Sequence, residues 1–244
     1  MRPRFKLLFG ALTLVAPTLA HATTMGFTDP AAFQAAIAGL SSGTLDFESI
    51  PAGTLLSTAG LTQAVGATGV GITFPAGVPN VLGGPPLDLE VNGLTSPGSH
   101  VLGTDDPGNF DQLIGGTSLG LAFTAPVTGF GLTIISVDTP GVTLLDGDLV
   151  LTAGGATASL AVADGTFLGT ANLTGGGTQD VYAYFLGLTS DTAFSGASLD
   201  VGAGVPDGAF FYYLDDFVAA VPEPSTALLL GLGLLSLARR HLHT

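Results

Sequence analysis

The sequence of 244 residues contains no cysteine and no tryptophan. Without cysteine the chain cannot form disulfides, zinc–thiolate sites or a cysteine nucleophile. Its fold must therefore be stabilised by a packed hydrophobic core, for which about 200 residues suffice as one domain. The Gly-x-Ser-x-Gly, His-Glu-x-x-His and Gly-Lys-Ser/Thr phosphate-loop motifs are also missing. Their absence argues against the classes of hydrolase, metalloprotease and nucleotide-binding enzyme that these motifs mark.

Basic residues are confined to the two ends of the chain, where they are Arg2, Arg4, Lys6, Arg239 and Arg240. Residues 23–220 contain eighteen of the nineteen acidic residues and one histidine, His100, so this body has a formal charge of about −18. Such a charge disfavours nucleic acid and anionic lipid, whose phosphates need Lys or Arg. It suits divalent cations. The alternative is that the acids are dispersed and only keep a Gly-rich domain soluble.

The first 22 residues have the three parts of a secretory signal peptide. Arg2, Arg4 and Lys6 precede the apolar stretch 7–19, and Ala20 and Ala22 supply the small residues that a signal peptidase recognises. We expect cleavage after Ala22. A permanent N-terminal membrane anchor is the alternative, and the short apolar run disfavours it.

The last residues, 221–244, also form three parts. The segment Val221-Pro222-Glu223-Pro224 is expected to be extended and accessible, because proline fixes φ and restricts the residue before it. The apolar run 227–238 covers about 20 Å as a helix, so it would be a short transmembrane helix in a locally thinned bilayer. Arg239 and Arg240 then predict a cytoplasmic C-terminus. A core helix of the body is the alternative, but the run has no polar face.

This order of Val221-Pro222-Glu223-Pro224, apolar span and Arg239-Arg240 resembles the PEP-CTERM sorting signal of Gram-negative bacteria. The resemblance implies processing by an exosortase, a membrane transpeptidase-like enzyme, and an association with extracellular polysaccharide and biofilm. We therefore divide the chain into a signal peptide (1–22), a body (23–220) and a sorting signal (221–244).

The body is predicted to be all-β, an antiparallel jelly-roll-like β-sandwich preceded by one short helix. Asp29 as N-cap and Pro30 at the first helical position predict a helix with Phe33, Ile37 and Leu40 on one stripe. After Gly43 short apolar and β-branched runs alternate with turn residues, as in sandwiches. The expected strands are 44–50, 71–74, 118–124, 128–137, 148–152, 157–163, 166–173, 181–188, 197–201 and 209–219.

Four segments of the body resemble the β-sandwich domains common among PEP-CTERM proteins. They are the helix start at 27–33, Leu-Asp-Phe-Glu at 45–48, Pro-Val-Thr-Gly-Phe-Gly at 126–131 and the aromatic-Asp-Asp strand at 212–217. The resemblance implies a carbohydrate-module-like jelly roll. It does not imply a ligand, because a fold alone does not fix function.

Carboxylates gather in three places that are candidates for a calcium site. They are Asp46 with Glu48, Asp105 with Asp106 and Asp111, and Asp215 with Asp216. Asp46 and Glu48 are expected to share one face of strand 44–50. Calcium takes six to eight such oxygens, but no EF-hand spacing is present. The alternative is turn chemistry for the loop and solvated faces for the strands.

We expect an exported, non-enzymatic structural or binding protein of the cell surface or extracellular matrix. Its expected partners are signal peptidase, exosortase, the inner membrane before processing, and polysaccharide, but not nucleic acid. No cofactor other than calcium is expected. One alternative is an extracellular carbohydrate-active enzyme, for which Asp46 and Glu48 are the eligible pair. His100 is expected to be a surface loop residue rather than a general base. The other alternative is a calcium-stabilised adhesin.

Overall fold

The computed structural model describes residues 23–56, 62–74, 81–83, 100–104, 112–116, 118–138, 143–172, 177–206 and 208–222. Within these ranges it has one α-helix, α1 (Pro30–Ala36), a 3-10 helix, η2 (Val162–Asp164), and strands that all pair antiparallel. This confirms the predicted all-β, sandwich-like fold class. The predicted signal peptide, the apolar run 227–238 and the residues Glu223, Pro224, Arg239 and Arg240 lie outside the described residues.

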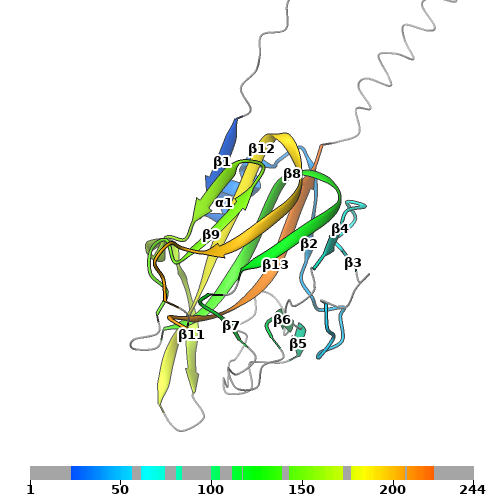
Figure 1. Cartoon of the computed structure of the whole chain (residues 1–244). Coiled ribbons are helices and arrows are strands. Elements are labelled where there is room, and N and C mark those ends of the chain that lie inside the picture. Colours follow the sequence, from blue (N-terminus) through cyan, green and yellow to red (C-terminus); the bar gives the residue numbers. More distant parts are fainter. Residues whose placement is uncertain are drawn as a thin grey trace, which may run out of the picture.

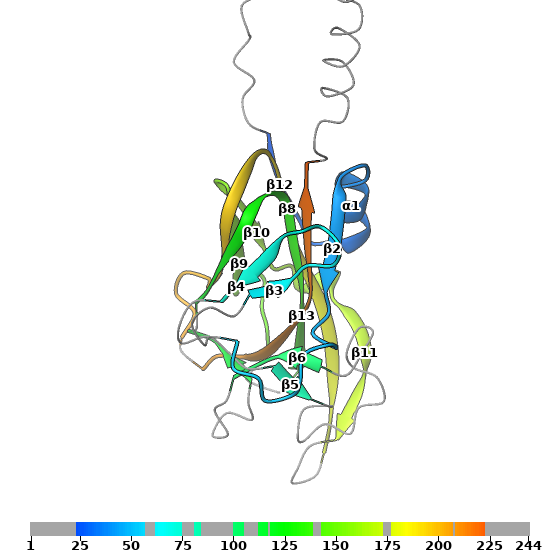
Figure 2. The same ribbon diagram turned by 90° about the vertical axis from the view of Figure 1, so that its right-hand side faces the viewer.

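The central path of the sheet runs β10-β9-β12-β8-β13-β6-β5, with β1 and β11 on β12, β2 and β7 on β13, and the β3–β4 hairpin on β8 (Figure 1). Figure 2 shows α1 on one side of β13 and the hairpins β3–β4 and β9–β10 on the other. The strands are β1 (Thr24–Phe27), β2 (Ser41–Leu45), β3 (Thr62–Ala64), β4 (Gly71–Thr73), β5 (Val81–Gly83), β6 (His100–Leu102), β7 (Leu113–Ile114), β8 (Leu119–Asp138), β9 (Leu149–Ala153), β10 (Ala156–Ser159), β11 (Thr166–Asn172), β12 (Thr178–Val201) and β13 (Phe211–Val221).

The strands β8 and β12 are each continuous where the sequence predicted two strands. The predicted strands 118–124 and 128–137 are one strand, because β8 runs through Pro126. The pairing of these two strands is irregular in two places: β12 has extra residues between Thr189 and Phe194, and β8 has extra residues between Ala122 and Val127, where Pro126 lies. Such bulges bend a strand and increase its twist. The two long strands can therefore curve around the core and contribute to both layers.

The main core lies between the layers and contains the alternating residues that the sequence predicted. All of the following are buried in it: Leu119, Leu121, Phe123, Phe130, Leu132 and Ile134. The central strands also have a second apolar face, which we call the outer face. There Val181, Ile135 and Tyr213 form one cluster, while Phe185 and Val218 pack against Phe33 and Ile37 of α1. The main sheet is thus covered on both sides over part of its length.

The helix α1 begins as the sequence predicted. Asp29 is its N-cap, and the Asp29 carboxylate accepts a hydrogen bond from the Ala31 N–H at 2.8 Å, with Pro30 in the first turn. The ring of Phe33 lies 5.2 Å from that of Phe185. The helix is shorter than the predicted apolar stripe, because the chain turns after Ala36 and Gly39 adopts a positive φ of 92°.

The predicted strand 44–50 is wrong beyond its first two residues, since β2 ends at Leu45. Phe47 has a left-handed backbone with φ of 60°, which regular extended strand backbone does not have. The Glu48 N–H donates to the Asp46 carboxylate at 3.3 Å, and the Ile50 N–H donates to the Phe47 carbonyl at 2.9 Å. Asp46 and Glu48 therefore lie in a turn and do not share a strand face.

Candidate functional site

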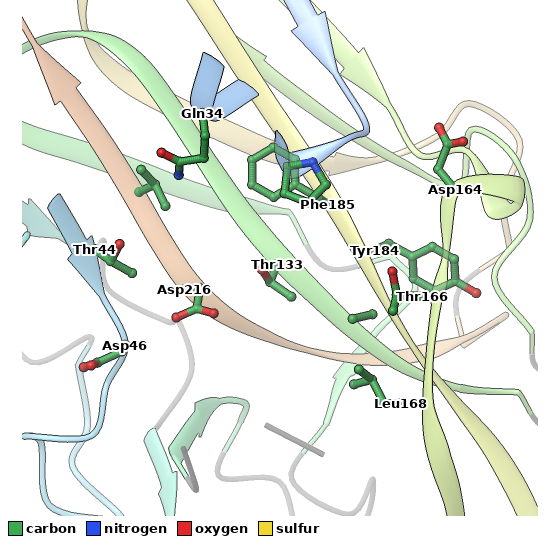
Figure 3. Close-up of a pocket in the computed structure, with 13 residues that line it drawn as sticks. Gln34, Thr44, Asp46, Thr133, Asp164, Thr166, Leu168, Tyr184, Phe185 and Asp216 are labelled. Atoms are coloured by element: carbon green, nitrogen blue, oxygen red, sulfur yellow. The ribbon is translucent and has the colours of Figure 1, made fainter. Parts of the chain in front are cut away.

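A groove of about 520 Å³ lies on the outer face of the main sheet (Figure 3). Its polar lining consists of the carboxylates of Asp46, Asp164 and Asp216, three threonines and Gln34. The threonines are Thr44, Thr133 and Thr166. Apolar side chains complete the wall. The groove therefore offers hydroxyl, amide and carboxylate oxygens, and none of the described residues that line it is Lys, Arg or His.

The position of Phe185 shapes the floor of this groove. Its ring passes so close to two glycines that a Cβ atom at Gly131 would lie 2.5 Å from it and one at Gly187 would lie 2.7 Å from it. The same Cβ at Gly187 would lie 2.7 Å from the ring of Phe33. These two glycines let the ring of Phe185 lie close to the backbone of the sheet. For that reason the floor of the groove lies close to the sheet backbone between α1 and β11.

One end of the groove is acidic, because two segments far apart in the sequence meet there. β2 pairs with β13 in the register Leu45 to Phe217, which brings the turn after β2 next to Asp215 and Asp216. Asp216 occupies a bulge in β13, between the pairs of Asp215 and Val218 with β8, and has φ of 47°. Asp46 and Asp216 both line the groove at this end (Figure 3).

Burial and neighbouring carboxylates raise the pKa values of Asp215 and Asp216. Asp215 is only 1% exposed, and burial, followed by the charge of Asp216, raises its pKa to about 8, although the Asp216 N–H donates to it at 2.8 Å. Burial, followed by the charges of Asp46 and Glu48, raises the pKa of Asp216 to about 6. We call Asp46, Glu48, Asp215 and Asp216 the acidic cluster. At neutral pH the cluster retains a proton on Asp215.

His100 connects the acidic cluster to β6. The His100 N–H donates to one oxygen of Glu48 at 2.6 Å, and its ring Nδ1 lies 3.3 Å from the other oxygen. The expectation of an isolated loop histidine is therefore wrong, because His100 begins a strand and has a carboxylate partner. This pairing holds Glu48 away from the groove, which it does not line.

The opposite end of the groove is formed by η2, β11 and β12. Asp164, Thr166 and Tyr184 lie together there (Figure 3). The Thr28 hydroxyl donates to the Asp164 carboxylate, which ties this end to the segment before α1. A Cβ at Gly165 would lie 2.4 Å from the ring of Tyr184, so the ring packs directly under the chain at that point.

The structure brings together four of the predicted calcium ligands, Asp46, Glu48, Asp215 and Asp216, and leaves three untested. Asp105, Asp106 and Asp111 lie outside the described residues. In the described part of the chain, no three His, Asp or Glu side chains converge as metal ligands would. Calcium therefore stays a prediction. The contributions of Asp164, Thr133 and Tyr184 were missed, and no local sequence signal marks them, because strand pairing alone assembles the groove.

The C-terminal residues contain a sorting motif. Residues 220–241 match the family model of the PEP-CTERM protein-sorting motif. The chain carries a PEP-CTERM sorting motif. Comparison with curated proteins and with solved structures gave no match.

The PEP-CTERM motif marks this chain as an exosortase-targeted protein that is exported and anchored at the cell surface. Val221 ends β13 and Pro222 follows it, so the sorting motif begins directly where the last strand of the body ends. Across the described ranges no helix has the length and apolarity to cross a membrane. The predicted transmembrane helix at 227–238 is outside those ranges.

Proposed function

We propose that the body is a non-enzymatic module that binds polysaccharide of the cell surface or extracellular matrix, with the outer-face groove as its binding site. The observation that carries this proposal is the lining of the groove. Its polar groups are carboxylates, hydroxyls and one amide, which hydrogen-bond to sugar hydroxyls. Leu168 and the small exposed parts of Phe185 and Tyr184, each 8% exposed, supply apolar surface for the C–H groups of a sugar ring.

The charge of the body narrows the class of polysaccharide to neutral polymers. The chain between the terminal signals has no Lys or Arg, and three carboxylates line the groove. An anionic polymer would meet like charge at both ends of the site, and the body has no Lys or Arg with which to displace the counterions of that polymer. A neutral chain of hydroxyl-rich rings meets no such repulsion.

Affinity electrophoresis of the exported protein through gels that contain a neutral or an anionic polysaccharide tests this proposal. We expect retardation in at least one gel of a panel of neutral glucans, mannans, xylans and galactans. We expect no retardation in alginate or hyaluronate gels. Equal mobility in every neutral gel, or retardation by the anionic polymers alone, would contradict the proposal.

A carbohydrate-active enzyme is the second candidate. The structure suggests a carboxylate pair for it that differs from the Asp46 and Glu48 suggested by the sequence. Asp46 and Asp216 line the same groove, and the pKa of Asp216 is raised to about 6. A glycosidase needs one protonated and one ionised carboxyl group across its cleft. The Asp216→Asn variant separates the two functions, because an enzyme would lose release of reducing ends while a binding module would have none to lose.

A calcium-stabilised adhesin is the third candidate, and the acidic cluster favours it. The described residues alone place no three ligands together, so this candidate depends on Asp105, Asp106 and Asp111 in the loop outside them. Calcium that binds the native state must raise the melting temperature. An equal melting temperature with calcium and with chelator would remove the candidate.

A further inference from the structure

The backbone nitrogen of Thr23, the first residue of the body, is held by a carboxylate. The Thr23 N–H donates to the Asp191 carboxylate at 3.1 Å, and the Asp191 N–H donates to the Thr23 carbonyl at 3.1 Å. In the antiparallel pairing of β1 with β12, Thr24 is the partner of Ser190. Thr23 and Asp191 therefore extend this pairing by one further position and fasten the end of β1.

Removal of the signal peptide would change the charge of this nitrogen. Cleavage after Ala22 hydrolyses the Ala22–Thr23 peptide bond, and the water molecule supplies the hydroxyl of the Ala22 carboxyl group and a hydrogen for the Thr23 nitrogen. An α-amino group has a pKa of about 7.7 to 8.0, so the new amine takes up a further proton near neutral pH. The nitrogen that donates a neutral hydrogen bond in the precursor then carries a positive charge beside Asp191.

The composition of the body leaves Asp191 without a competing cation. Residues 23–220 contain no Lys or Arg, and their one histidine, His100, lies 3.3 Å from Glu48. The single lysine of the whole chain is Lys6, which lies in the predicted signal peptide. After cleavage the α-amine of Thr23 is therefore the single primary amine of the protein.

The strand that begins at this amine is closely packed on its neighbours. A Cβ atom at Gly26 would lie 2.6 Å from the Thr157 carbonyl oxygen, so β1 lies directly against β10. The ring of Phe27, at the end of β1, lies 5.7 Å from the ring of Phe33 in α1. The same helix supplies Gln34 to the groove. The position of β1 therefore bears on the position of α1.

We propose that removal of the signal peptide creates an ion pair between the Thr23 α-ammonium group and the Asp191 carboxylate, which strengthens the attachment of β1 to β12 in the processed protein. Asp191 is exposed, and exposed ion pairs contribute little to global stability. The end of a strand at the surface opens at low cost, however, so a small gain is measurable locally. The inference rests on cleavage after Ala22 and does not depend on what the groove binds.

Hydrogen exchange of the β1 amides, measured by NMR on the exported, processed protein, tests this inference. An amine-selective acetylating reagent modifies Thr23 alone, because the processed chain has no lysine. Acetylation removes the charge but keeps an N–H donor, as in the precursor. We expect the β1 amides to exchange about threefold faster after acetylation, and the β11 amides to be unchanged. The difference should disappear in about 1 M salt, which screens exposed charges.

Two variants provide the matched controls. Asp191→Asn should accelerate exchange in β1 as acetylation does, and acetylation of this variant should add no further change, because the partner of the charge is already absent. Asp180→Asn removes an exposed carboxylate from the same strand, at the end that pairs with β11. It should respond to acetylation like wild type.

Three outcomes would overturn the inference. The first is equal exchange of the β1 amides before and after acetylation. The second is an Asp191→Asn protein that responds to acetylation as strongly as wild type. The third is an exported protein whose N-terminal residue, determined by sequencing, is not Thr23. None of these results bears on polysaccharide binding, so failure of this inference and failure of the proposed function are distinguishable.

Discussion

The ring of Phe47 stands edge-on to the ring of Phe217, with centroids 5.2 Å apart and an interplanar angle of 80°. Each ring neighbours a carboxylate of the acidic cluster, since Phe47 lies between Asp46 and Glu48 and Phe217 follows Asp216. Phe47 and Asp216 are also the non-glycine residues with positive φ in the described ranges. Left-handed backbone of this kind persists only where packing enforces it. The contact between the two rings therefore fixes the position of the acidic end of the groove.

Replacing Phe47 with alanine should destabilise the protein strongly. The side chain is fully buried, and truncating a buried phenylalanine costs about 3 to 5 kcal/mol. Urea unfolding of the variant measures this loss, with the exposed Phe167→Ala as control, for which we expect a change within about 0.5 kcal/mol. A Phe47→Ala protein as stable as the control would show that the ring contact does not hold the two segments together.

The acidic cluster should make stability fall as pH rises from about 4 to 8. The folded pKa of Asp215 is about 8 and its ordinary value is 3.8, so the native state holds a proton that the unfolded state releases over this range. Stability linked to this group is complete below pH 4 and is lost as pH rises through 8, at up to about 1.4 kcal/mol per pH unit. Asp215→Asn should flatten this decline in urea unfolding at several pH values.

Asp180→Asn is the control for this pH dependence, because Asp180 pairs at the far end of β12 and β11. It should keep the slope of wild type. An Asp215→Asn protein whose stability still declines like wild type would show that Asp215 is ionised in the native state and that the cluster holds no proton.

Because Phe185 lies so close to Gly187, a side chain added at position 187 should disturb the floor of the groove. In Gly187→Ala the new Cβ would lie 2.7 Å from the rings of both Phe185 and Phe33, so one ring must move. Overpacking of this kind costs about 1 to 3 kcal/mol, and it should also weaken polysaccharide binding because Phe185 lines the groove. Gly155→Ala is the control, since no atom lies within 4 Å of a Cβ there and only its positive φ is strained. It should lose stability without losing affinity.

The sorting motif predicts a defined change in the exported product. Processing at the PEP-CTERM motif should remove the tail, so mass spectrometry of material released from cells should find no peptide that contains Arg239 or Arg240. Replacing Pro222, Glu223 and Pro224 together with alanine should leave the body intact and retain the tail. Released wild-type protein that still contains Arg239 would contradict this processing.

Local signals in the sequence were sufficient to predict the start of the helix and the core residues of the central strands. The Asp29-Pro30 cap and the alternation around Phe130 depend only on near neighbours, and both were predicted. The continuity of β8 through Pro126 was not, because it depends on the irregular pairing of β8 with β12, in which β8 has extra residues between Ala122 and Val127. The position of Asp216 beside Asp46 was also beyond local signals, since it requires β2 to pair with β13 from the other end of the body.

A substitution that fills the groove tests most directly whether the groove is the polysaccharide site. Ala183 on β12 lines the groove, so a phenylalanine at this position would occupy the floor of the groove. Ala193 is exposed on the same strand and is the control, because it lines neither the groove nor the hollow formed by Leu145, Val162 and Tyr182. The measurement is the calorimetric affinity of Ala183→Phe and Ala193→Phe for the neutral polysaccharide that retards the wild-type protein most. We predict at least about tenfold weaker binding for Ala183→Phe, which corresponds to about 1.4 kcal/mol, and wild-type binding for Ala193→Phe. Wild-type affinity in a folded Ala183→Phe protein would contradict the account.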